Sequence, residues 1–197
     1  MIELVLDFVS INSYLALNPA KRLADDLGVE LKLTPLRTTS ELGSVANSPD
    51  AGVAERHRQV RAKYKQLDAM RYAAVQGLKI AIVGNDCDSS VALRGLLAAQ
   101  DQDKGFDFAN TVFQRYWVGE LELDSPSEIL EVLKEVGIRE FNDSDPRWDL
   151  EHIRAEMDER EISSVPTFWV NGERYSGRQH LPMIRWQLGR YEGAGPL

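Results

Sequence analysis

The chain has 197 residues, of which 43% are hydrophobic and 27% charged, and this composition is typical of one folded domain with an insertion or of two small domains. The formal net charge of −8 repels phosphate backbones, and no basic stripe interrupts it, so we expect no nucleic-acid partner. No segment approaches the roughly 20 apolar residues that cross a bilayer, so we expect no membrane association either.

The cysteine and histidine content bounds the chemistry further. Cys87 is the single cysteine, so the chain cannot form an internal disulfide. The first residues begin a strand at once and lack the basic, apolar and small-residue order of an export signal, so we expect a cytoplasmic protein. His57, His152 and His180 lack the spacing of metal ligands, so we expect no metal site.

The beginning of the chain predicts a β-α-β unit. Residues 2–9 form an apolar, β-branched run that is typical of a buried strand. A helical pattern follows and ends at Gly28, and residues 29–34 alternate as a second strand. Because the connections are short, the crossover should be right-handed and the two strands parallel.

The middle of the chain shows only helical signals, and strand signals return near its end. Helices are expected at residues 51–76, 89–100, 107–117 and 125–136, and from Asp145-Pro146 to about residue 159. Residues 167–170 then predict a strand that enters a type I′ turn at Asn171-Gly172. A strand at residues 173–175 and a helix at about 179–190 complete the pattern. The two ends of the chain therefore predict an α/β fold with a mixed four-stranded sheet, into which a helical block is inserted.

Two places in this pattern are candidates for chemistry. Ser10 stands just before the first helix, where unpaired N–H groups and the helix dipole stabilise an anion, although the same serine is also a preferred helix cap. Pro166 opens the third strand. A cis Val165-Pro166 bond would leave the Val165 backbone free to pair with an extended ligand, whereas a trans proline would simply start the strand.

Several short motifs extend over nearly the whole chain. They are Asp7-Phe8-Val9-Ser10-Ile11-Asn12-Ser13-Tyr14-Leu15, Asn47-Ser48-Pro49, the helical set Arg61, Tyr64, Asp68 and Arg71, Ala92-Leu93-Arg94, and Val165-Pro166-Thr167-Phe168 followed by Gly177 and Leu181. In order and spacing they resemble the branch of the DsbA-like thioredoxin superfamily that contains 2-hydroxychromene-2-carboxylate isomerase and the kappa-class glutathione transferases. This resemblance implies a thioredoxin-like domain formed by residues 1–50 and 161–197, with an all-helical insertion domain at residues 51–160. It also implies a cis Val165-Pro166 bond.

The resemblance further implies a glutathione-dependent enzyme, either an isomerase or a transferase, that acts on a small molecule such as an aromatic carboxylate. Ser10 would hold the glutathione sulfur as a thiolate without exchanging disulfides with it. Asn47, Val165 and Pro166 would contact the tripeptide, and the insertion would also provide a face for a homodimer. Arg61 would bind a substrate carboxylate.

The sequence departs from the family pattern at the same site. Ile11-Asn12 replaces Pro-Tyr, so Asn12 would form the wall next to the sulfur and the substrate. Gln179 stands where the family has an aspartate for the γ-glutamyl ammonium group, and Arg178 could pair with the γ-glutamyl carboxylate instead. A thioredoxin-like protein that only binds a small thiol or a peptide is therefore the alternative. A dithiol oxidoreductase is excluded at this site because positions 10 and 13 are serines.

Overall fold

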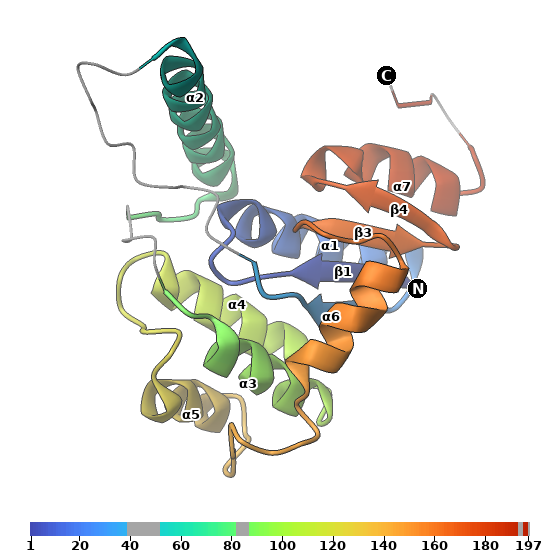
Figure 1. The fold of residues 1–197 in the computed structure, drawn as a ribbon. Helices are drawn as coiled ribbons and strands as arrows, with labels where there is room; N and C mark the ends of the chain where they lie inside the picture. Colours follow the sequence, from blue (N-terminus) through green and yellow to red (C-terminus); the bar gives the residue numbers. More distant parts are fainter. Residues whose placement is uncertain (39–51, 82–86, 193–194, 197) are drawn as a thin grey trace.

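A mixed four-stranded sheet forms the centre of the molecule (Figure 1). The computed structural model describes residues 1–38, 52–81, 87–192 and 195–196. The strand order is β2-β1-β3-β4, and the strands are β1 (Ile2–Leu6), β2 (Leu31–Pro35), β3 (Thr167–Val170) and β4 (Glu173–Ser176). β1 runs parallel to β2 and antiparallel to β3, and β3 runs antiparallel to β4. The predicted α/β fold with a mixed sheet is confirmed.

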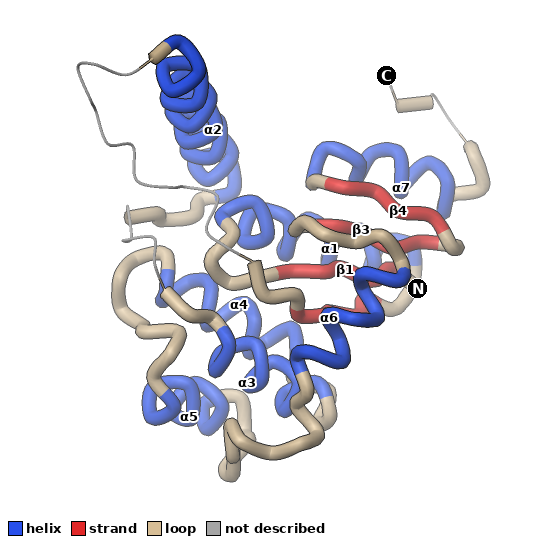
Figure 2. The backbone as a smooth tube through the Cα atoms, viewed as in Figure 1, coloured by secondary structure: helices blue, strands red, loops and turns tan. Residues whose placement is uncertain are grey.

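Between β2 and β3 the described backbone is helix and loop (Figure 2). The α-helices are α1 (Ile11–Leu27), α2 (Val53–Gln76), α3 (Ser90–Gln100), α4 (Gly105–Tyr116), α5 (Pro126–Glu135), α6 (Leu150–Glu159) and α7 (Leu181–Leu188), and a short 3₁₀ helix, η1 (Arg178–His180), precedes α7. Helices therefore occupy the predicted insertion, and its division from the rest of the chain at residues 50 and 161 stays a prediction. Within the described residues, no helix combines the length and apolar character needed to span a membrane.

The expected helix start at Asp145-Pro146 is wrong, because α6 begins at Leu150. The Asp145 carboxylate accepts the backbone N–H of Arg147 at 3.0 Å, which closes a local turn instead of starting a helix. The Asp149 side chain is the cap, since it accepts the N–H groups of Glu151 and His152 at 3.0 Å each.

The central strand β1 is covered on both faces, which explains why all five of its residues are buried. Alternate side chains point to opposite faces. Leu4 and Leu6 belong to the larger core, which also contains residues of α1 and α7, whereas Val5 packs in a smaller cluster with Met157 of α6. The sheet is therefore a layer between α1 and α7 on one side and α6 on the other.

Phe8 connects the sheet to the helices of the insertion. Its ring lies 4.9 Å from that of Phe113 and 6.2 Å from that of Phe108, both on α4, and Phe113 also stacks on Tyr14 of α1. These four rings are buried, so α4 is fixed against the start of α1 by aromatic packing.

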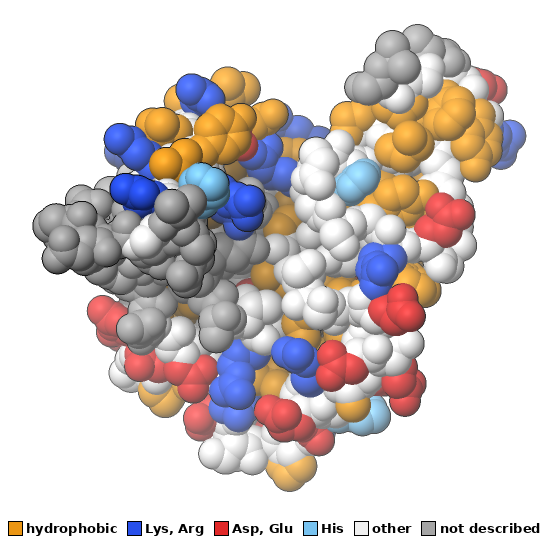
Figure 3. Space-filling model, turned by 45° about the horizontal axis from the view of Figure 1, so that its top comes forward, with side chains coloured by type: hydrophobic (Ala, Val, Ile, Leu, Met, Phe, Trp, Pro, Cys, Tyr) orange, Lys and Arg blue, Asp and Glu red, His pale blue; other side chains and the backbone are white. Residues whose placement is uncertain are grey.

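α2 extends away from this core (Figure 1). Among the side chains of α2 that the structure describes, Ala69 and Ala73 are buried, and Gln76 Nε2 donates to the Leu15 carbonyl at 3.0 Å. The helix also leaves large apolar side chains exposed, at Val60, Tyr64, Leu67, Met70, Tyr72 and Val75. Figure 3 shows apolar side chains mixed with Lys and Arg in this region of the surface.

Candidate functional site

The corner between β1 and α1 holds Ser10 as the N-terminal cap of α1. Ser10 Oγ accepts the backbone N–H of Ser13 at 3.2 Å, and the Ser10 backbone has the extended conformation of a cap, with φ −92° and ψ 112°. Because the hydroxyl acts as an acceptor in this bond, its proton remains available, and it donates to no other described residue. The capping interpretation is therefore correct, and the hydroxyl proton makes no hydrogen bond to another described residue.

Asp7 ties this corner to the residues that follow β2. Its buried carboxylate accepts the backbone N–H of Thr38 at 2.6 Å, the Thr38 hydroxyl at 2.9 Å and the Val9 N–H at 3.4 Å. The Asp7 N–H donates to Ser13 Oγ at 3.4 Å. Burial raises the pKa of Asp7, although the hydrogen bonds from Thr38 and Val9 oppose this effect. The network holds the start of α1, and with it Ser10, against the end of β2.

The segment before β3 contains a cis Val165-Pro166 peptide bond, as the resemblance implied. The Pro166 carbonyl accepts the Gly177 N–H at 2.8 Å, and the Ser164 carbonyl accepts the Thr167 hydroxyl at 2.7 Å. Between these two fixed groups, the Val165 backbone makes no hydrogen bond to another described residue. Its N–H and carbonyl are therefore free to pair with an extended ligand.

Arg178 joins three elements at the same place. Its guanidinium donates to the Asp68 carboxylate of α2 at 2.7 Å and to Asn12 Oδ1 of α1 at 3.3 Å. It also lies over the ring of Tyr72, 3.6 Å from the ring centroid, in a cation–π contact. The Arg178 side chain is only 15% exposed, so this cation is held in a defined position.

These groups surround one cavity of about 450 Å³. It lies between the start of α1, one face of α2, the cis-proline segment and the end of β4, and it is lined by Asn12, Tyr64, Lys65, Asp68, Tyr72, Ser164, Val165, Pro166, Ser176, Gly177, Arg178 and Gln179. Two basic and one acidic side chain line it beside two tyrosines, so it suits a ligand that carries carboxylate groups and an extended backbone.

The structure brings five of the predicted site residues together in this cavity: Asn12, Val165, Pro166, Arg178 and Gln179. Ser10 does not line it, because its side chain is buried at 1% exposure in the corner that carries Asn12. Arg61 lies on the exposed surface of α2 and is not among the lining residues. Asn47 lies outside the described residues.

Sequence reasoning did not assign a role to the remaining α2 residues of the site. Tyr64, Asp68 and Tyr72 follow one another at intervals of four, which places them on one face of a helix. This spacing was visible in the sequence and could have identified the face that meets the cavity. The tertiary contact between Asp68 and Arg178 was not visible, because 110 residues separate the two positions.

Among the described residues, the one group with metal-ligand geometry is Cys87 with Glu122 and Asp124. Both carboxylates are exposed. Burial raises the pKa of the Cys87 thiol, and the charges of Asp124 and Glu122 raise it further, in the direction expected for a thiol among acids. The thiolate that would attack an electrophile is therefore disfavoured at this position.

The β-α-β start, the β-β-α end and the cis-proline beside the first helix define a thioredoxin-fold protein. Residues 1–189 match the DSBA-like thioredoxin domain family, and the chain belongs to this family.

Individual relatives extend over almost the same length. The chain is 23% identical to 2-hydroxychromene-2-carboxylate isomerase from Pseudomonas putida, over 96% of this chain and 95% of that protein. It is similar to the solved structure of 2-hydroxychromene-2-carboxylate isomerase, with a TM-score of 0.69 and 21% identity over 96% of this chain and 94% of that one. It is also similar to the cytosolic disulfide reductase DsbM from Pseudomonas aeruginosa solved with GSH, with a TM-score of 0.63 and 16% identity over 97% and 96% of the two chains.

Proposed function

We propose that this chain is a glutathione-dependent isomerase of the 2-hydroxychromene-2-carboxylate isomerase type, or a glutathione transferase, in which Ser10 stabilises the thiolate. The observation that carries the proposal is one cavity that combines Asn12, the free backbone of Val165 and the fixed cation of Arg178. The similarity to relatives named as this isomerase over 96% of the chain supports the same activity class.

The residues of the cavity fit the parts of a γ-glutamyl tripeptide. Its volume of about 450 Å³ falls within the roughly 300–1,000 Å³ of small-molecule sites. The unpaired N–H and carbonyl of Val165 match the backbone of a cysteinyl residue, and Arg178 and Lys65 offer charge to its carboxylates. Asp68 is the acid in the cavity that can accept the γ-glutamyl ammonium group, since Gln179 is neutral.

Glutathione would supply a sulfur nucleophile that adds to a conjugated substrate and leaves again in an isomerisation, or stays on the product in a transfer. Ser10 would donate its free O–H proton toward the sulfur, and the N-terminus of α1 would add a positive potential. A thiol with a pKa of about 8.5 is mostly protonated at pH 7, and each unit by which the pKa falls corresponds to about 1.4 kcal/mol. A charge-assisted hydrogen bond of about 1.5–3 kcal/mol supplies that amount. The tyrosines of α2 would pack against an aromatic substrate.

Calorimetric titration of glutathione tests the role of Ser10. Wild type should bind glutathione with release of a proton at pH 7 and with less release at about pH 8.5, where more of the free thiol is already ionised. Ser10→Ala should bind more weakly and release fewer protons at pH 7, whereas Ser127→Ala, which changes an exposed serine on α5, should match wild type. Conjugated aromatic carboxylates would then be screened as substrates. Absence of binding at millimolar glutathione would refute the proposal.

One observation favours a second candidate, a protein that binds a small thiol or a peptide without activating it. Ser10 is 1% exposed and does not line the cavity. If wild type and Ser10→Ala bind glutathione equally and neither releases a proton, the cavity binds its ligand without forming a thiolate, and this second function replaces the first.

A further inference from the structure

α2 presents apolar side chains to solvent on the side that faces away from its contacts with α1. Four of them lie in one line along the helix, are between 49% and 86% exposed, and form what we call the outer stripe: Val60, Tyr64, Leu67 and Val75. Positions nine apart lie on opposite sides of an α-helix, because nine residues make two and a half turns. Val60 therefore lies opposite the buried Ala69. Tyr64 lies opposite the buried Ala73 in the same way.

The outer stripe is long enough to be a contact surface. From Val60 to Val75 it extends about 22 Å, or about four helical turns. Surface helices normally carry polar side chains on the side turned away from their own protein. Single exposed apolar side chains need no explanation, but four in one line are typical of a surface on which another molecule docks.

The charges beside the outer stripe are positive. Four exposed cations lie three or four positions from a residue of the stripe, which is the spacing of neighbours on a helix surface: Arg56, Arg61, Lys63 and Arg71. Their side chains make no hydrogen bond or ion pair with another described residue. Among the described side chains of α2 the one acid is Asp68, and Arg178 already holds it. These cations are therefore available to an acidic partner.

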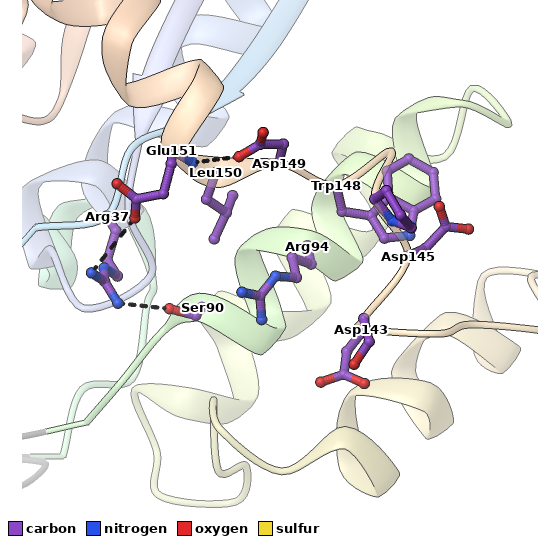
Figure 4. Close-up of a pocket in the computed structure, with 11 residues that line it drawn as sticks. Arg37, Ser90, Arg94, Asp143, Asp145, Trp148, Asp149, Leu150 and Glu151 are labelled. Carbon is purple, nitrogen blue, oxygen red and sulfur yellow. Dashed lines mark hydrogen bonds and ion pairs between the residues drawn. The ribbon is translucent and has the colours of Figure 1, made fainter.

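The positive charge of α2 contrasts with the rest of the molecule. In the cavity between the start of α3 and the loop that leads into α6, Arg37 donates to Ser90 Oγ at 3.2 Å and lies 4.0 Å from a Glu151 carboxylate oxygen (Figure 4). The whole chain has 31 Asp and Glu against 23 Lys and Arg, and α2 contains six of these cations but two of the acids. Positive charge is therefore concentrated on one helix of an acidic protein, where it would attract an acidic partner.

We propose that the outer stripe binds an amphipathic helix of another protein, in which Glu and Asp flank the apolar residues. Apolar side chains at intervals of three and four interlock with the same spacing on a facing helix. The acids of that helix would meet the cations beside the stripe. Leu67 and Arg71 do not line the cavity at Arg178, so the proposal does not depend on the binding of glutathione.

Arg71 favours this partner over a bilayer. It lies four positions from both Leu67 and Val75, within the line of the stripe. A facing helix can place a carboxylate opposite the guanidinium, whereas the acyl region of a membrane offers it no partner. The α2 helix of a second copy is disfavoured as well, because it would set the same cations against one another.

Two synthetic peptides of opposite charge test the proposal by fluorescence anisotropy. The acidic probe is three repeats of Glu-Ile-Glu-Ala-Leu-Glu-Ala, and the basic probe has Lys in place of each Glu. Wild type should bind the acidic probe at least about tenfold more tightly than the basic probe, and added NaCl should reduce this preference. The acidic probe should shift the backbone amide NMR signals of residues 56–75 rather than those of residues 164–179.

Two variants and a control assign the binding to the stripe. Leu67→Ser should weaken binding of the acidic probe by about tenfold or more, because it removes an apolar side chain from the middle of the stripe. Arg71→Gln should reduce the preference for the acidic probe over the basic one. Met183→Ser, which changes an exposed apolar residue on α7, should bind both probes like wild type. All three side chains are exposed, so a loss of folding would not explain a difference among the variants.

Equal affinity of wild type for the two probes would overturn the proposal, as would the absence of binding at about 100 μM acidic probe. Binding to phosphatidylserine vesicles that Leu67→Ser abolishes, without binding of the acidic probe, would assign the stripe to a membrane instead. A dimer in sedimentation velocity that Leu67→Ser dissociates would assign it to a second copy. Either result would replace the proposed partner.

Discussion

The guanidinium of Arg178 donates a hydrogen bond of 2.7 Å to the carboxylate of Asp68, which joins η1 to α2 across 110 residues of sequence. The same guanidinium lies over Tyr72, one turn further along α2. This contact therefore helps to hold α2 against the described core, together with Ala69, Ala73 and Gln76.

Arg178→Met should loosen α2. The substitution removes the ion pair and the stacking on Tyr72 while it keeps an apolar stem, so we expect a loss of about 1–2 kcal/mol in the free energy of unfolding. Hydrogen–deuterium exchange should accelerate at the amides of residues 64–76. Arg139→Met, at an exposed arginine, is the matched control and should leave exchange in α2 unchanged. Unchanged exchange in Arg178→Met would show that Ala69 and Ala73 suffice to hold the helix.

Gln179→Asp should strengthen glutathione binding. Gln179 lines the cavity as a neutral side chain, and its Nε2 donates to the Ser176 carbonyl at 2.9 Å. A carboxylate there would attract the γ-glutamyl ammonium group, and a charge-assisted hydrogen bond corresponds to about a tenfold gain in affinity. Titration calorimetry measures this gain in affinity for glutathione, with Gln179→Asn as the neutral control. Weaker binding by the aspartate variant would mean that Asp68 already neutralises the ammonium group.

Asp7 should make stability depend on pH in a direction unusual for an aspartate. Because burial raises the pKa of Asp7 in the folded protein above its ordinary value of 3.8, the native state binds a proton more readily than the unfolded chain. Wild type should therefore gain stability relative to Asp7→Asn as the pH falls from 7 through the raised pKa, and the gain should level off below 3.8. Urea unfolding at a series of pH values measures this difference. A loss of wild-type stability over the same interval would mean that the hydrogen bonds from Thr38 outweigh burial.

Arg160→Met should reveal a contribution of Glu3 to stability whose pH dependence is opposite to that of Asp7. Burial opposes ionisation of Glu3, but hydrogen bonds from Arg160 and Thr34, with the charge of Lys32, hold its pKa below the ordinary 4.5. Removing Arg160 leaves a buried carboxylate with weaker compensation, which should cost about 3 kcal/mol at pH 7. This contribution is fully present above 4.5 and should disappear as the pH falls through the lowered pKa.

Thermal or urea unfolding of the Arg160→Met variant tests this prediction when it is measured at pH 7 and again below the lowered pKa of Glu3. Arg154→Met, which breaks an exposed pair on α6, should change stability by less than about 0.5 kcal/mol. An Arg160→Met penalty that persists unchanged at low pH would assign the effect to lost packing on Trp169 rather than to charge.

Most of the fold could be predicted from patterns among residues that are neighbours in the sequence. The apolar run of β1, the Gly28 end of α1 and the Asn171-Gly172 turn each depend on neighbouring residues alone, and the structure confirms all three. The start of α6 was missed because two acidic caps compete there, and the side-chain bonds of Asp145 close a turn that propensity alone does not reveal.

The site was only partly readable. The family resemblance implied that Asn12, the cis-proline segment and Arg178 contact one ligand, and all three line the same cavity. The sequence could not reveal that Arg178 is already paired with Asp68, or that Arg61 faces outward on the same helix. These facts depend on the rotation of α2 against the body, which nonlocal contacts determine.

β1 lies between β2, which follows it by about 30 residues, and β3, which lies near the other end of the chain. During synthesis, β1 can therefore pair with β2 on one edge early, but its other edge stays open until residues 167–170 have also left the ribosome. Premature termination anywhere in the helical region would release a product with an exposed apolar edge. Such fragments should aggregate or require chaperones, so nonsense mutations in the middle of this gene should leave no soluble partial protein.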